Sequence, residues 1–255
     1  MIVTGWLFDS YPTDKGITVW LIDLDGLKYK VHYSFRPVFY VDASEFDRKI
    51  LYSISRKYRC TVVEERVEKV ELYSNKILPV TEVQVSNPLQ YQKVIFELSQ
   101  QLKFYQFYNA DIKTGQMFYY TTGLFPLAYG EFEIIDNHLM GWVLHDSFDT
   151  EMYTVPPLTI MSLTPSMTLL APKYQRNLTL EIEVEGRKTV LEQESPEELL
   201  DGINSYLLKY DPDILLTSYG DAALLPMITA LAHQRKAPLY LNRDATVPYV
   251  MTTAM

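Results

Sequence analysis

The stretch DPDILLTSYGDAALLPMI, residues 211–228, decides how the second half of this chain folds. Pro212 ends the helical pattern before it, and the apolar run DILLTSYG is typical of a short strand. Helical spacing begins directly after that run, in DAALLPMITALAHQRK. Asp211 and Asp213 stand in the turn before the strand, where short carboxylates accept hydrogen bonds from the local backbone. We therefore assign both to the fold rather than to chemistry, and expect Asp221 to lie in a loop or at a helix N-cap.

Three strand-like runs and one helical run precede this stretch, at 158–163, 177–186, 187–194 and 195–210. The helical run opens with Ser195 and, three residues later, Glu198, which is the pattern of a capping box. The order three strands, helix, strand, helix predicts an α/β domain of ribonuclease-H-like order over residues 158–255. Pro156 and Pro157 mark the boundary before it.

The first half predicts a different arrangement. Residues 17–33 alternate apolar and polar side chains around the turn Asp25-Gly26, which indicates an antiparallel hairpin. The order strand, helix, strand, strand, helix, strand follows, as in the split β-α-β of ferredoxin-like domains, with Ser44 as the expected N-cap of the first helix. These six runs lie at 37–42, 44–58, 60–73, 78–86, 88–102 and 103–111. We predict a mixed α/β (α+β) chain with a first domain at 1–130, a connector at 131–157 and the second domain at 158–255.

Composition narrows the classes of function. The 255 residues carry a net charge of -9, so the chain taken alone should bind nucleic acid weakly. The 20 tyrosines are explained better by packing in strands than by stacking on bases. No apolar run is long enough for a membrane helix, and the single cysteine, Cys60, is expected to be buried. We expect a cytoplasmic, nucleoid-associated protein without membrane contact. Neither zinc spacing nor a phosphate-binding loop is present, so no metal or cofactor is expected.

Four segments, in register, resemble the N-terminal and exonuclease regions of a family B DNA polymerase. The strongest match is residues 211–228, through DPDI and, in register with it, Gly220, Asp221 and Pro226. The other three are FRPVFYV, FYNADIKTGQMFYYTTGLFP and PPLTIMSLTPS. The resemblance spans nearly the whole chain, and it implies that palm, fingers and thumb are absent from it.

The same resemblance implies that the exonuclease motifs are degenerate. Thr164 and Ser166 occupy the positions of the acidic pair in the first motif, and Leu224 that of the metal-binding aspartate in the second. A third motif is not found in the final residues. Two divalent cations require several carboxylate ligands, so we expect no catalytic residue and no enzyme activity from this chain alone. Glu181 and Glu183 imitate the lost pair, but they would leave one strand before the helix where the fold requires two.

The resemblance implies a non-catalytic N-terminal and exonuclease-like part, or subunit, of a family B-like DNA polymerase. It would serve as a scaffold and contact the single-stranded template in DNA replication or repair. The implied partner is a polymerase catalytic subunit, or a C-terminal region, that carries palm and thumb. Two alternatives are a metal-dependent 3'-5' exonuclease with displaced carboxylates, such as Asp201, Asp221 and Glu183, and a protein-interaction module without DNA contact. Candidate DNA contacts are Arg36, Lys103, Lys113, Tyr119, Tyr120, Arg235, Lys236 and Arg243.

Overall fold

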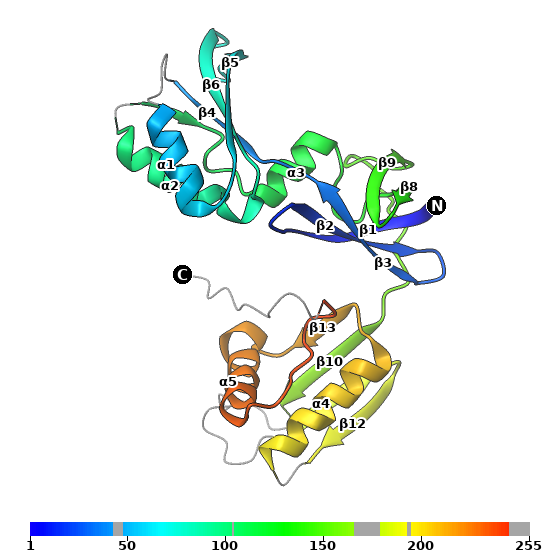
Figure 1. The fold of residues 1–255 in the computed structure, drawn as a ribbon. Coiled ribbons are helices and arrows are strands. Elements are labelled where there is room, and N and C mark those ends of the chain that lie inside the picture. The colour runs from blue at the N-terminus through cyan, green and yellow to red at the C-terminus, as the bar shows by residue number, and fades with distance from the viewer. Residues whose placement is uncertain (43–47, 104, 166–178, 193–194, 245–255) are drawn as a thin grey trace. The chain divides into compact units, whose positions relative to one another are not determined.

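The computed structural model describes residues 1–42, 48–103, 105–165, 179–192 and 195–244, and its fold is mixed α/β (Figure 1). The chain divides into two compact units, Met1–Pro157 and Leu158–Met255. Ser44 and Ser166, which were expected at a helix N-cap and at a motif position, lie outside the described residues. No helix among the described residues is both long enough and apolar enough to cross a membrane.

Five strands of the first unit close a small barrel in the order β1-β2-β3-β9-β8. Their bounds are Ile2–Pro12 for β1, Gly16–Asp23 for β2, Lys28–Ser34 for β3, Tyr129–Ile135 for β8 and His138–Leu144 for β9. The predicted hairpin is the antiparallel pair β2 and β3. On β1, Gly5 pairs with Gly130 of β8 on one side and with Asp23 of β2 on the other. A Cβ on Gly5 would meet the backbone oxygen of Ile22, so only glycine allows β1 to lie this close to β2.

The predicted connector at 131–157 is wrong over its first half, because β8 and β9 belong to the barrel. Phe132, Ile134 and Leu139 are buried in the core of the first unit. The exposed residues of β8 alternate with these buried ones, which is the period of a half-buried strand. Apolar burial therefore holds this segment in the first unit.

The rest of the first unit is a four-stranded antiparallel sheet in the order β5-β6-β4-β7. Its elements are β4 (Val38–Val41), α1 (Arg48–Tyr58), β5 (Val62–Val70), β6 (Ile77–Val85), η1 (Pro88–Gln90), α2 (Tyr91–Gln101) and β7 (Phe107–Tyr108), followed by α3 (Thr114–Thr122). Helices α1 and α2 lie beside this sheet (Figure 1). Ile54 of α1 and Leu98 of α2 belong to the same buried core as Phe39 of β4 and Val83 of β6. The strand expected at 103–111 is reduced to two paired residues.

The second unit has a four-stranded sheet in the order β12-β11-β10-β13, in which β10 and β13 are parallel. Its elements are β10 (Ile160–Pro165), β11 (Leu180–Val184), β12 (Arg187–Leu191), α4 (Pro196–Tyr210), β13 (Ile214–Thr217), the π-helical turn η3 (Gly220–Leu224) and α5 (Leu225–Arg235). Ser195 caps α4, because its Oγ accepts a hydrogen bond from the backbone N of Glu198 at 3.2 Å. The helix predicted from residue 221 thus begins as a π-helical turn.

Candidate functional site

Leu224 lies at the end of η3 and is fully buried, with 0% of its surface exposed. It belongs to the apolar core of the second unit, together with Met161 and Leu163 of β10 and Ile228 of α5. Thr164, also on β10, is half-buried and pairs in register with Glu181 of β11. The position that the resemblance assigns to a metal-binding aspartate therefore holds core packing.

The backbone around η3 directs Leu224 into that core. Tyr219 precedes the turn in the left-handed conformation, with φ of 54°, and its carbonyl accepts hydrogen bonds from the backbone N of Ala223 and Leu224 at 2.9 and 3.2 Å. Gly220 is buried, and a Cβ there would collide with the side chain of Thr217. The N-cap position belongs to Tyr219, so the expected N-cap or loop role of Asp221 is corrected to an exposed place in the first turn. A carboxylate there interacts favourably with the positive end of the helix dipole.

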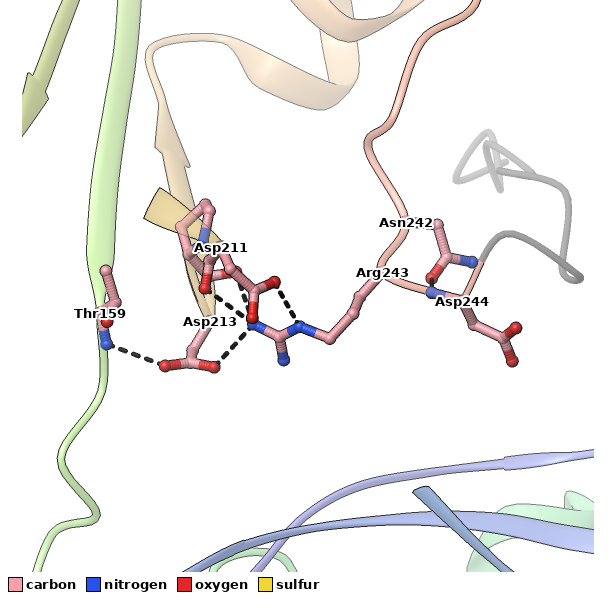
Figure 2. Close-up of polar contacts among 7 residues, drawn as sticks. Thr159, Asp211, Asp213, Asn242, Arg243 and Asp244 are labelled. Atoms are coloured by element: carbon pink, nitrogen blue, oxygen red, sulfur yellow. Dashed lines mark hydrogen bonds and ion pairs between the residues drawn. The ribbon is translucent and has the colours of Figure 1, made fainter. Parts of the chain in front are cut away.

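The aspartates of the DPD segment are tied to Arg243 (Figure 2). The carboxylate of Asp213 has 0% of its side chain exposed, and it accepts hydrogen bonds from the Thr159 backbone N and from Arg243 Nη2, both at 2.9 Å. Arg243 Nε lies 2.6 Å from Asp211 Oδ1, and Nη2 also donates to the carbonyl oxygens of Asp211 and Pro212. The guanidinium thus joins the segment after α5 to the turn before β13. Arg243, a predicted DNA contact, is occupied by these internal bonds.

The displaced carboxylates of the nuclease alternative lie at separate places. Glu183 lies 3.5 Å from Lys188 Nζ across β11 and β12, and Lys188 also contacts Glu181 at 2.9 Å. These hydrogen bonds and charges raise the pKa of Lys188, chiefly through Glu181. Asp201 on α4 and Asp221 on η3 are exposed. The described part of the chain contains no group of three or more His, Cys, Asp or Glu residues that could hold a metal ion.

The other predicted DNA contacts are spread over both units. In the first unit Arg36, Lys103, Lys113 and Tyr120 are exposed, but Tyr119 is half-buried and its hydroxyl accepts a hydrogen bond from Ser10 Oγ at 2.8 Å. Burial raises the pKa of Tyr119. In the second unit Arg235 lies 3.3 Å from Glu197, and Lys236 is exposed at the end of α5.

A cationic hollow of about 610 Å³ lies within the first unit and contains Arg36. We use this name for the recess lined by Asp14, Lys15, Ser34, Phe35, Arg36, Arg59, Ser86 and Asn87. The three cations come from the β1–β2 turn, the β3–β4 connection and the end of α1. Sequence reasoning missed Lys15 and Arg59, because no local pattern links residues so far apart along the chain. Only the fold brings them together.

A second hollow, of about 550 Å³, lies over the sheet of the first unit. Tyr40, Tyr73 and Tyr108 are among its lining residues, and Lys69 Nζ lies 5.1 Å from the centre of the Tyr40 ring. Phe107 also lines this hollow, and its ring stacks on that of Phe39 with the ring centres 6.2 Å apart. Phe107 thus takes part both in core packing and in the wall of this hollow.

The fold of this chain is similar to that of part of a family B DNA polymerase. The solved structure concerned is the family B DNA polymerase from the hyperthermophilic archaeon Pyrobaculum calidifontis, with a TM-score of 0.73 and 18% sequence identity. The match covers 94% of this chain and 34% of the archaeal chain, so this chain spans about a third of that polymerase. No protein-family profile and no curated protein sequence matches the chain.

Proposed function

We propose that this chain is a non-catalytic N-terminal and exonuclease-like part, or subunit, of a family B-like DNA polymerase. The similarity of fold over 94% of the chain supports a polymerase-related role. The order β5-β6-β4-β7 supports a ferredoxin-like assignment for the sheet of the first unit. The order β12-β11-β10-β13, with β10 and β13 parallel, supports a ribonuclease-H-like assignment for the second.

The burial of Leu224 carries the non-catalytic part of this proposal. A two-metal site needs carboxylate oxygens around two cations about 3.5–4 Å apart. Leu224 offers no oxygen, and its fully buried side chain fills the space with apolar atoms. Thr164 on the neighbouring strand supplies a hydroxyl in place of a carboxylate. The second unit would then serve as a scaffold.

The contact with template DNA is proposed for the first unit. A net charge of -9 disfavours long-range attraction of DNA, so any contact by this chain must come from local groups of cations. The cationic hollow is such a group. A partner with palm and thumb would supply the remaining basic surface that holds duplex DNA.

The partner is tested by using the tagged full-length chain as bait in extracts of the source cell. We expect a polypeptide with polymerase palm motifs, including paired aspartates, to co-purify. The matched control is the same tagged chain, unfolded before it is immobilised. This control should not retain the polypeptide with palm motifs. Recovery of no such polypeptide from the native bait would argue against the split-polymerase proposal.

Catalysis is tested separately with the purified chain, Mg²⁺ or Mn²⁺, and single-stranded DNA labelled near its 3' end. We expect no metal-dependent release of nucleotides. Suppose instead that nucleotides are released, and that Asp221→Asn abolishes this release while the control Asp149→Asn does not. That result would favour the exonuclease with displaced carboxylates.

A further inference from the structure

The cationic hollow concentrates positive charge in an acidic chain. Lys15, Arg36 and Arg59 are all exposed and line one recess, against the single carboxylate of Asp14. None of the three cations forms an ion pair with another residue that the structure describes. Like charges gathered in a recess repel each other, and an anion bound among them relieves that repulsion.

The neutral residues of the hollow have donors left over. Ser86 Oγ accepts a hydrogen bond from the Thr61 backbone N at 2.7 Å, which leaves its O–H to donate. Asn87 Oδ1 accepts from the Leu89 backbone N at 3.0 Å, which leaves the side-chain NH₂ group as a donor. The acceptor atoms are thus used by the backbone, and the donors suit a ligand rich in acceptor oxygens.

Size and donor geometry select among anions. The planar guanidinium groups of Arg36 and Arg59 match the paired oxygens of a phosphate, and Lys15 adds a point charge. The volume of about 610 Å³ is in the range of sites for small molecules and exceeds the needs of a lone inorganic ion. A flexible single strand can place one phosphate and its nucleoside in the hollow. A duplex is stiff, so bending it to enter the hollow costs energy.

We infer that the cationic hollow binds an internucleotide phosphate of single-stranded DNA through Lys15, Arg36 and Arg59. This inference rests on the proposed template contact and assigns it to one site. Asp14 acts against the ligand there, because its carboxylate repels the phosphate. The hollow therefore predicts changes of opposite sign for two neighbouring residues, Asp14 and Lys15.

The test measures fluorescence anisotropy of a labelled single-stranded oligonucleotide of about 16 nucleotides and mixed sequence, titrated with the full-length chain over a range of salt concentrations. Arg36→Gln, Arg59→Gln and Lys15→Gln should each weaken binding about tenfold at low salt. Each should also lower the slope of log K against log salt by about 0.7, the value for one phosphate contact on a single strand. Asp14→Asn should tighten binding.

The matched control is Arg66→Gln, which removes the same charge from an exposed position on β5 outside the hollow. Thermal unfolding of every variant verifies that it is folded. If Arg36→Gln and Arg59→Gln weaken oligonucleotide binding no more than Arg66→Gln does, the assignment to this site is overturned. The proposed template contact would then still stand. Absence of salt-sensitive binding by the unmodified chain would overturn both.

Two further arms identify the ligand. A duplex of the same sequence should bind more weakly than the single strand, and equal affinity with equal loss in the variants would overturn the preference for single strands. Inorganic phosphate should displace the oligonucleotide only at much higher concentration. Displacement by phosphate at concentrations comparable to the oligonucleotide would reassign the hollow to free phosphate.

Discussion

Leu224 contributes its whole side chain to the core of the second unit, and this burial decides what a carboxylate would do there. An aspartate at this position would be surrounded by Met161, Leu163 and Ile228. Its charge would lie among these apolar side chains, which cannot compensate it. The sequence alone shows that no carboxylate stands at residue 224, but only the packing shows that the space around it is filled.

Leu224→Asp is therefore expected to restore no cleavage and to destabilise the fold by about 3–5 kcal/mol, the range for an uncompensated buried charge. The measurements are a Mg²⁺-dependent and Mn²⁺-dependent exonuclease assay and urea unfolding. Leu208→Asp is the control, since Leu208 lies on α4 with 66% of its surface exposed and should tolerate the same change. Metal-dependent cleavage by the Leu224→Asp variant would refute the prediction.

The DPD segment gives a second prediction at a single residue. Asp213→Ala would leave the Arg243 guanidinium and the Thr159 backbone N without the buried carboxylate that joins them. We expect a loss of about 3 kcal/mol in the free energy of unfolding, measured by urea denaturation. Asp221→Ala removes an exposed aspartate from the same motif and should cost much less. Equal losses in the two variants would show that the bonds to Asp213 do not stabilise the second unit.

At the scale of elements, periodicity and caps predicted most helices and strands in the right order. The strands β8 and β9 were missed although Phe132 and Ile134 alternate with exposed residues. Pro156 and Pro157 indicate a boundary only after these strands, so the segment before them was assigned to a connector. The π-helical form of η3 could not be predicted either. It depends on the left-handed Tyr219 and on the contact between Gly220 and Thr217, which are features of the folded backbone.

The seam between β3 and β9 gives a prediction about pH. The two strands pair through His32 and His138, whose rings meet edge to face with their centres 5.5 Å apart. Burial lowers the pKa of His32, and the nearby His138 lowers it further. The charge of Asp14 raises this pKa in opposition. Lys15 acts both ways, because its charge lowers the pKa and its backbone hydrogen bond raises it. The folded chain thus takes up a proton at His32 less readily than the unfolded chain. Stability is unaffected above the unfolded pKa of about 6.5 and falls as the pH drops below it.

This dependence is measured by urea unfolding at a series of pH values from about 8 to about 5, on either side of the unfolded pKa. His32→Gln should flatten part of the decline toward acid. His233→Gln, at an exposed position on α5, is the control and should leave the decline as it is. A decline that His32→Gln leaves unchanged would exclude His32 as its source.

At the scale of the whole molecule, each unit has its own apolar core, one built on Phe39, Phe118 and Phe132 and the other on Leu163 and Leu224. A unit with its own core has what it needs to fold alone. The residues of the cationic hollow all belong to the first unit, although they are separated along the sequence. The hollow was beyond sequence reasoning for that reason, and it should survive removal of the second unit.

We therefore expect residues 1–157, expressed alone, to unfold cooperatively and to bind single-stranded DNA within about twofold of the full chain, since additivity holds for sites that share no partners. Residues 158–255 should bind it much more weakly, because Arg243 is held by Asp211 and Asp213 and Arg235 by Glu197. Circular dichroism and anisotropy of the two pieces check this. If residues 158–255 bind the DNA and residues 1–157 do not, the DNA contact lies outside the hollow. Arg36→Gln in residues 1–157 would then not change the affinity for DNA.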